Sequence, residues 1–232
     1  MEPPARRNEP ASLLPFPAGT PTQTPVEDIR FRRLLGEEAW RALPHAVRRR
    51  FSKHFAETAV EVFVGKIVGA RATRTGRLLA QITRLIGAPL PLDAAVGTPA
   101  TVTVCEEKTT KGQLWTRVYG RSDGFPQVIR SAKRFQGPTG LEEYLGYGIG
   151  MALTVDAADN MMRFRSDHFF MCLFGRRVRI PGALLPIAVT VRHIDQGNGG
   201  FIFDLEVRGD RLGLLIYQAG LFRDVFDTPG TP

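Results

Sequence analysis

One short stretch of the sequence brings together three side chains that could hold an anionic or aromatic ligand. In Trp115-Thr-Arg117-Val-Tyr119 the indole, the guanidinium and the phenol fall on every second residue, so on a β-strand they share one face. If that face is buried, Arg117 needs a carboxylate from the protein or an acidic ligand group, because an unpaired buried charge is costly. Glu142 and Glu143 are the expected protein partners. If the face is exposed, Arg117 stacks on the aromatic rings in solvent, and both arrangements remain open.

A second group of cations lies on a predicted helix that also carries apolar residues at helical spacing: Arg48, Arg49, Arg50 and Lys53. A basic face beside an apolar face is typical of a helix that lies on a membrane surface. It is equally typical of a helix that packs on a protein core with its charges in water. These four residues therefore define a hypothetical membrane or anion surface. The later run Arg176-Arg177-Val-Arg179 could close around a phosphate or carboxylate, or form a solvated loop.

The familiar catalytic and metal-binding motifs are missing from the sequence. It contains no glycine-rich nucleotide fingerprint, no zinc-protease motif, no serine-hydrolase elbow and no CxxC. The four histidines have no ligand spacing, and two cysteines cannot form a zinc site or a disulfide scaffold on their own. We therefore expect no metal, no cofactor and no catalytic residues of a known type, which favours a protein that is not an enzyme but leaves enzymatic activity open.

The net charge of +8 and the pI near 10.1 suggest a nucleic-acid or membrane-surface partner at first sight. The charge is uneven, however. Residues 30–84 hold 13 basic and four acidic residues, whereas residues 85–232 hold 16 and 15. The excess thus lies on the early part of the chain, while the remainder is nearly neutral. This distribution argues against nucleic acid and leaves a local anionic surface as the electrostatic suggestion.

The hydrophobic pattern changes from helical to alternating along the chain. Apolar residues from Leu34 to Phe55 recur at three- and four-residue steps, with Pro44 expected to separate two helices, and residues 76–86 form another helical pattern. Clear period-two strands follow at 101–105, 114–119, 161–170, 187–194, 201–208 and 212–222. Weaker strands are predicted at 62–70, 128–135 and 148–155.

These elements predict a single α+β domain over residues 29–224. We expect a strongly curved antiparallel β-sheet, or an incomplete β-barrel, of about eight or nine strands with the N-terminal helices packed on it. Residues 1–28 contain seven of the 17 prolines and are interpreted as a disordered Pro-rich leader, and residues 225–232 as a frayed C-terminus. The leader is too broken by proline to be a secretory signal, which favours the cytoplasm.

The order of several short elements resembles a known family. These elements are Phe31-x2-Leu-Leu-Gly36, Trp40-x2-Leu-Pro44, Gly87-x-Pro-Leu-Pro91, Trp115-x-Arg-x-Tyr119, Glu143-x2-Gly146, Gly200-x-Phe-x-Phe203 and Gly213-Leu-Leu-x-Tyr217-x2-Gly220. Over about residues 31–222 the chain is similar to the bacterial domain-of-unknown-function family 4166 (DUF4166). In that family the domain occurs alone or after a nicotinamide-nucleotide-binding domain like those of reductases and epimerases. The resemblance implies no activity and no catalytic residues.

Three functional hypotheses follow. The first is a non-enzymatic domain that binds a hydrophobic or lipid-like small molecule in an apolar pocket of the curved sheet, with Trp115, Arg117, Tyr119, Glu143 and Tyr217 as candidate ligand-binding residues. The second is an accessory or catalytic domain that works with a nicotinamide-dependent reductase or epimerase as its partner protein. The third is peripheral membrane association through the basic helix.

Overall fold

The computed structural model describes residues 27–54, 59–85, 87, 90–91, 95–121, 124–158 and 160–225. Nearly all of the predicted leader (1–28) and C-terminal tail (225–232) lies outside these residues, as does Phe55.

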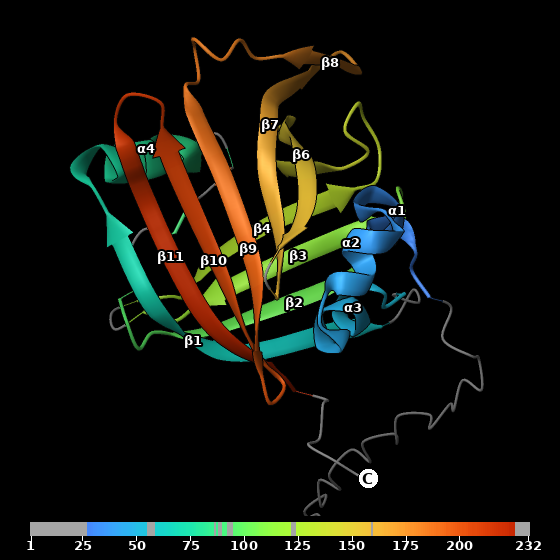
Figure 1. Ribbon diagram of the computed structural model, residues 1–232. Helices are drawn as coiled ribbons and strands as arrows, with labels where there is room; N and C mark the ends of the chain where they lie inside the picture. The colour runs from blue at the N-terminus through green and yellow to red at the C-terminus, as the bar shows by residue number, and fades with distance from the viewer. Residues whose placement is uncertain are drawn as a thin grey trace, which may run out of the picture.

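Most of the described chain forms one antiparallel sheet. Its strands are β1 (Val60–Ala72), β2 (Pro99–Glu107), β3 (Gly112–Tyr119), β4 (Gln127–Arg134), β5 (Glu142–Gly146), β6 (Ile149–Ala158), β7 (Met161–Leu173), β8 (Arg176–Arg179), β9 (Ile187–Gly197), β10 (Gly200–Gly209) and β11 (Gly213–Asp224). The order is β6-β5-β4-β3-β2-β1-β11-β10-β9-β7-β8, and β6 also pairs with β7. That pairing closes ten strands into a barrel, and β8 pairs with the last residues of β7, beyond the stretch that pairs with β9 (Figure 1).

The closed barrel refines the predicted sheet. All nine predicted strands are present among the described residues, but β5 and β8 were not predicted, the barrel is complete rather than open, and the fold is mainly β rather than α+β. β5 carries Glu142 and Glu143 at its start and β8 is largely arginine, so neither shows apolar alternation. Closure itself depends on the long β6–β7 hairpin, which brings β7 beside β9 as well.

Three short helices fill one end of the barrel (Figure 1): α1 (Arg30–Leu35), α2 (Glu37–Ala42) and α3 (His45–Phe51). Their apolar residues are buried against strands β6, β7 and β9, with Phe31 fully buried and its ring centroid 6.0 Å from that of Phe164. The predicted break at Pro44 is confirmed, because this residue lies between α2 and α3. We call this end of the molecule the plugged end.

The fourth helix, α4 (Arg74–Leu85), lies at the opposite end of the strands (Figure 1). It follows directly on β1 and packs on β11 through its small residues Gly76 and Ala80. The approach is close: a Cβ atom at Gly76 would lie 2.2 Å from the carbonyl oxygen of Leu215. The segment that follows α4 contacts β4. The Gln127 side chain of β4 donates a hydrogen bond to the Leu90 carbonyl of this segment at 3.1 Å.

Candidate ligand-binding cavity

The half of the barrel nearer α4 encloses a cavity. Its volume is about 120 Å³, and it is partly open to solvent. Apolar side chains from many strands form most of its wall, among them Ile67, Val102, Ile129, Met151, Val191 and Phe222. Leu90 and Pro91, which follow α4, contribute to the lining as well. A mostly apolar lining with a few polar groups suits a small apolar molecule.

The candidate residues of β3 point into the barrel. Trp115 and Tyr119 are each only 6% exposed and pack in the interior cluster with Phe63, Val102 and Phe222. Arg117 and Tyr119 line the large cavity. Because side chains alternate across a strand, the closed barrel places this face of β3 inside. The face that carries Trp115, Arg117 and Tyr119 is therefore the buried one.

Arg117 faces a buried carboxylate across two strands. Its Nη1 donates to the Ser131 hydroxyl on β4 at 3.1 Å, and its Nη2 lies 3.6 Å from Oε1 of Glu143 on β5. The Ser131 hydroxyl in turn donates to Glu143 at 2.6 Å, and Lys133 Nζ donates to the same carboxylate at 2.9 Å. The expected protein partner of Arg117 is therefore Glu143.

This cluster contains more basic groups than acidic ones. Burial alone would raise the pKa of Glu143, but Lys133 and Arg117 outweigh this effect and hold the pKa at about 2. Burial lowers the pKa of Lys133, and the Glu143 carboxylate opposes that shift. Two basic side chains, Lys133 and Arg117, therefore share the single carboxylate of Glu143 in the wall of an apolar cavity.

Two further polar groups line the cavity without hydrogen-bond partners among the described residues: the Tyr119 hydroxyl and the Gln218 side-chain amide. Burial raises the pKa of Tyr119, so its hydroxyl stays protonated and can donate. Gln218 was not among the candidates from the sequence. It shares one face of β11 with Ile216 and Phe222, and this apolar period-two pattern could have identified it.

A smaller chamber, with a volume of about 20 Å³, lies towards the plugged end. Phe203 lines both spaces, and its ring meets that of Trp115 edge-on with centroids 5.5 Å apart. Trp115 therefore belongs to the smaller chamber, where its indole N–H donates to the Gln113 side chain at 3.2 Å. The two rings divide the barrel interior into a larger and a smaller compartment.

The smaller chamber also contains His193, a residue that the sequence did not single out. Its ring is 1% exposed, stacks on Phe201 with centroids 4.6 Å apart, and neither ring nitrogen has a hydrogen-bond partner among the described residues. Burial and, secondarily, the nearby Arg50 lower the pKa of His193 to about 3. The imidazole is therefore neutral across the physiological range.

Most of the cations on and after the basic helix contact other parts of the protein rather than solvent. Arg50 is buried, donates to Asp195 at 3.2 Å and to the Gly199 carbonyl at 3.1 Å, and lies over the Phe201 ring. Lys53 forms ion pairs with Glu61 and Asp224. The four cations therefore do not form one open face: Arg48 is half-buried, and only Arg49 among them is exposed. The glycine-rich segment after Asp195 serves as a binding site for Arg50.

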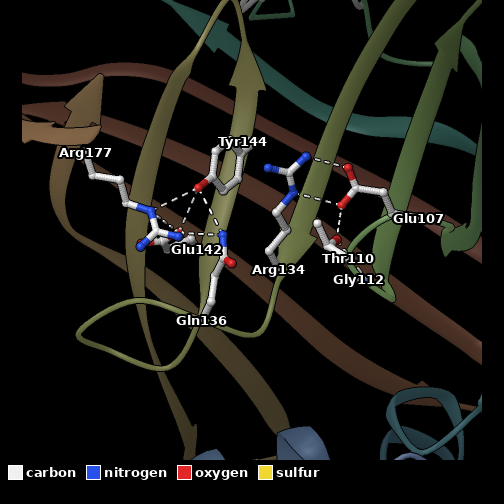
Figure 2. A network of polar contacts seen from close by, with 8 residues as sticks. All are labelled: Glu107, Thr110, Gly112, Arg134, Gln136, Glu142, Tyr144 and Arg177. Carbon is white, nitrogen blue, oxygen red and sulfur yellow. Dashed lines mark hydrogen bonds and ion pairs between the residues drawn. The ribbon is translucent and has the colours of Figure 1, made fainter. Parts of the chain in front are cut away.

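The second glutamate lies on the opposite face of β5 from Glu143. Glu142 is 1% exposed and is enclosed by Gln136, Tyr144 and Arg177, whose Nε lies 3.3 Å from the carboxylate (Figure 2). Figure 2 also shows Arg134 of β4 reaching the Glu107 carboxylate. One cation of the Arg176–Arg179 run thus binds a carboxylate of the protein itself.

Tyr217, the remaining candidate, does not line either space. It neighbours Gln218 on β11 and therefore points to the other face, where burial and the nearby Asp204 carboxylate raise its pKa. The cavity thus brings together Arg117, Tyr119 and Glu143 of the predicted set, with Trp115 one compartment away.

Comparison with known proteins gives a family but no activity. The model of the family DUF4166, described as a domain of unknown function, matches residues 43–222. No curated protein and no solved structure matches the chain significantly. The match includes every barrel strand except the last two residues of β11, and α1 and α2 precede it. Among the described residues, no helix is long and apolar enough to cross a membrane.

Proposed function

Since the chain belongs to the DUF4166 family, whose function is unknown, its role must be argued from the cavity, and we propose that it binds an apolar small molecule with an anionic head group. The apolar part would occupy the larger compartment of the barrel. The head group, a carboxylate or a similar anion, would accept hydrogen bonds from Arg117. This is the first of the three hypotheses drawn from the sequence, with an anionic head group now proposed for the ligand.

The observation that carries this proposal is the pair of basic side chains that share one carboxylate in the cavity wall. Lys133 and Arg117 share Glu143, and only one Arg117 nitrogen has a hydrogen-bond partner, the Ser131 hydroxyl, among the described residues. A buried positive charge next to apolar surface is costly unless it is neutralised. An anionic ligand would remove that cost, and the planar guanidinium suits a carboxylate.

Two other side chains support a polar head at the same place. The Tyr119 hydroxyl and the Gln218 amide line the cavity with unused hydrogen-bonding capacity. Together with Arg117 they supply donors on β3 and β11. A few polar groups in an otherwise apolar pocket are the usual means of fixing a ligand's orientation.

The test compares a carboxylate ligand with its neutral counterpart. A fluorescent fatty-acid analogue and its methyl ester are titrated into the wild-type protein and the Arg117→Gln variant. Loss of a charge-assisted hydrogen bond worth about 1.5–3 kcal/mol should weaken binding of the acid about 10- to 100-fold. Binding of the ester should change by less than about threefold. Arg208→Gln, on the outer face of β10, is the matched control and should leave both affinities unchanged.

Equal losses for acid and ester in Arg117→Gln would show that Arg117 supports the cavity without recognising charge. Absence of binding of both ligands to the wild-type protein, combined with native mass spectrometry of host-purified protein that finds no bound molecule, would refute the proposal.

A further inference from the structure

The end of the barrel opposite the helical plug exposes large apolar side chains on several separate connections. By the antiparallel register, this end holds α4, the β5–β6, β7–β8 and β10–β11 turns, and the β8–β9 connection. Each of them carries a strongly exposed apolar residue: Leu78, Leu85, Tyr147, Phe174, Leu184 and Leu212. Leu85, Tyr147 and Phe174 are more than four-fifths exposed. We call these six residues the apolar rim.

The plugged end differs sharply. There the large apolar residues of α1–α3 are buried in the core, and the exposed ones are Ile29, Val60 and Val225, none more than half exposed. The contrast between the two ends is therefore a property of position in the fold. Single exposed apolar residues need no explanation, but a concentration of them at one end marks an interaction site.

The helix α4 carries a stripe of large apolar residues that faces solvent instead of the protein. Gly76 and Ala80 form its buried side, whereas Leu78, Ile82 and Leu85 recur at helical spacing on an exposed side. Its three arginines are exposed as well. An exposed apolar stripe flanked by arginines is the pattern of a helix that lies in a lipid interface.

The surface around the apolar rim is strongly positive, which favours an anionic partner. Within α4, residues 147–148, residues 174–186 and residues 210–212 there are seven arginines and one acidic residue, Asp210. Two copies of this surface facing one another would bring arginines against arginines, which disfavours a symmetric dimer. The side chains also stand on separate turns rather than in one flat patch, so each can insert between lipid head groups.

We propose that the apolar rim and its arginines dock this end of the barrel onto an anionic phospholipid membrane. The docking surface includes α4, and the ligand cavity lies in the same half of the barrel, so a docked molecule would present the cavity end to the lipid. The surface differs from the basic helix suggested by the sequence, and membrane docking does not depend on what the cavity binds.

Vesicle flotation of the full chain tests this docking. The wild-type protein should float with vesicles containing phosphatidylglycerol and only weakly with pure phosphatidylcholine. The double variant Leu78→Glu/Leu85→Glu should reduce binding to the anionic vesicles about tenfold or more, because each inserted leucine contributes apolar burial. Val60→Glu makes the same exchange at a half-exposed site of the plugged end and should leave binding unchanged.

The electrostatic part is tested separately. The triple variant Arg74→Glu/Arg77→Glu/Arg84→Glu should weaken binding to anionic vesicles about 100-fold, from about fivefold for each arginine near the surface. Its weak binding to phosphatidylcholine should not fall. A tryptophan introduced as Leu85→Trp should shift its emission to the blue on addition of anionic vesicles, whereas Val60→Trp should not.

Full flotation of Leu78→Glu/Leu85→Glu, or no flotation of the wild type, would overturn the proposal. Wild-type protein that sediments as a dimer, and as a monomer after the same double substitution, would assign the apolar rim to a second copy instead. The Arg117→Gln variant should float normally, so failure of ligand binding and failure of docking can be told apart.

Discussion

His193 combines a buried aromatic environment with two unsatisfied nitrogens, which makes it costly to the folded state. Phe51, Phe201 and Phe203 surround its ring, and no described residue accepts or donates a hydrogen bond at either nitrogen. A polar group of this kind lowers stability by about 1–3 kcal/mol relative to an apolar one of similar shape. Its effect also depends on pH, because the folded protein resists protonating it.

The expected result concerns His193→Phe. Folding lowers the pKa of His193 from 6.5 to about 3. Between these two pH values the unfolded chain binds a proton at His193 and the folded protein does not. The free energy of unfolding of the wild type is therefore unaffected by His193 above about pH 6.5 and falls as the pH drops towards 3. The phenylalanine variant lacks this loss. Urea unfolding should find the variant more stable at about pH 7, with the advantage about 3 kcal/mol larger at about pH 4. His45→Phe, at an exposed site, should show no such difference. Parallel stability curves for wild type and His193→Phe would contradict this account.

At the scale of elements, alternation predicted nine of the described strands, and helical spacing predicted the helical segments and the break at Pro44 but not the break at Gly36 that separates α1 from α2. What sequence could not supply was the pairing of β7 with both β6 and β9, because closure depends on contacts between strands rather than on the pattern within one. For the cavity, the shared face of Trp115, Arg117 and Tyr119 followed from period two, but the side it faces depended on closure. Gln218 was missed because its apolar neighbours, and not its own chemistry, place it inside.

Gly76 illustrates how one residue fixes an element. Replacing it with alanine would place a methyl group 2.2 Å from the Leu215 carbonyl oxygen, so α4 would have to move away from β11. We expect Gly76→Ala to lower the free energy of unfolding by about 1–3 kcal/mol, in spite of alanine's better helix propensity. Chemical denaturation measures this change. Gly182→Ala, where a Cβ meets nothing within 4 Å, is the matched control. A stabilised Gly76→Ala would mean that α4 tolerates the shift.

At the scale of the whole molecule, the N-terminal helices and the barrel form one core. Phe31 of α1 lies edge-on to Phe51 of α3 and to Phe135 and Phe164 of the barrel region, at centroid distances of 5.1, 4.9 and 6.0 Å. This helix precedes the part of the chain that the family model matches. The packing nevertheless makes α1 part of the same cooperative unit as the strands.

Phe31→Ala should therefore destabilise the entire fold by about 3–5 kcal/mol. Far-ultraviolet circular dichroism, which follows the strands, and tryptophan fluorescence, which reports on Trp40 and Trp115, should give one coincident transition at a lower denaturant concentration. Phe125→Ala removes a ring that is 92% exposed and should change little. Separate transitions for the two signals would show that the plug unfolds independently of the barrel.

Closure of the ten-strand ring has a consequence for the behaviour of the protein at high concentration. In the described sheet every ring strand pairs with a neighbour on both sides, although β5 pairs with only Ala132–Arg134 of β4, and β8 is the described strand that pairs on one side only. An unpaired edge invites a strand from another molecule and so seeds aggregation. Here that edge consists of Arg176, Arg177, Val178 and Arg179, all exposed, so an approaching copy of β8 meets like charges before it can pair. The arginine run that resembled an anion-binding site in the sequence thus opposes aggregation through pairing of β8 with a strand of another molecule.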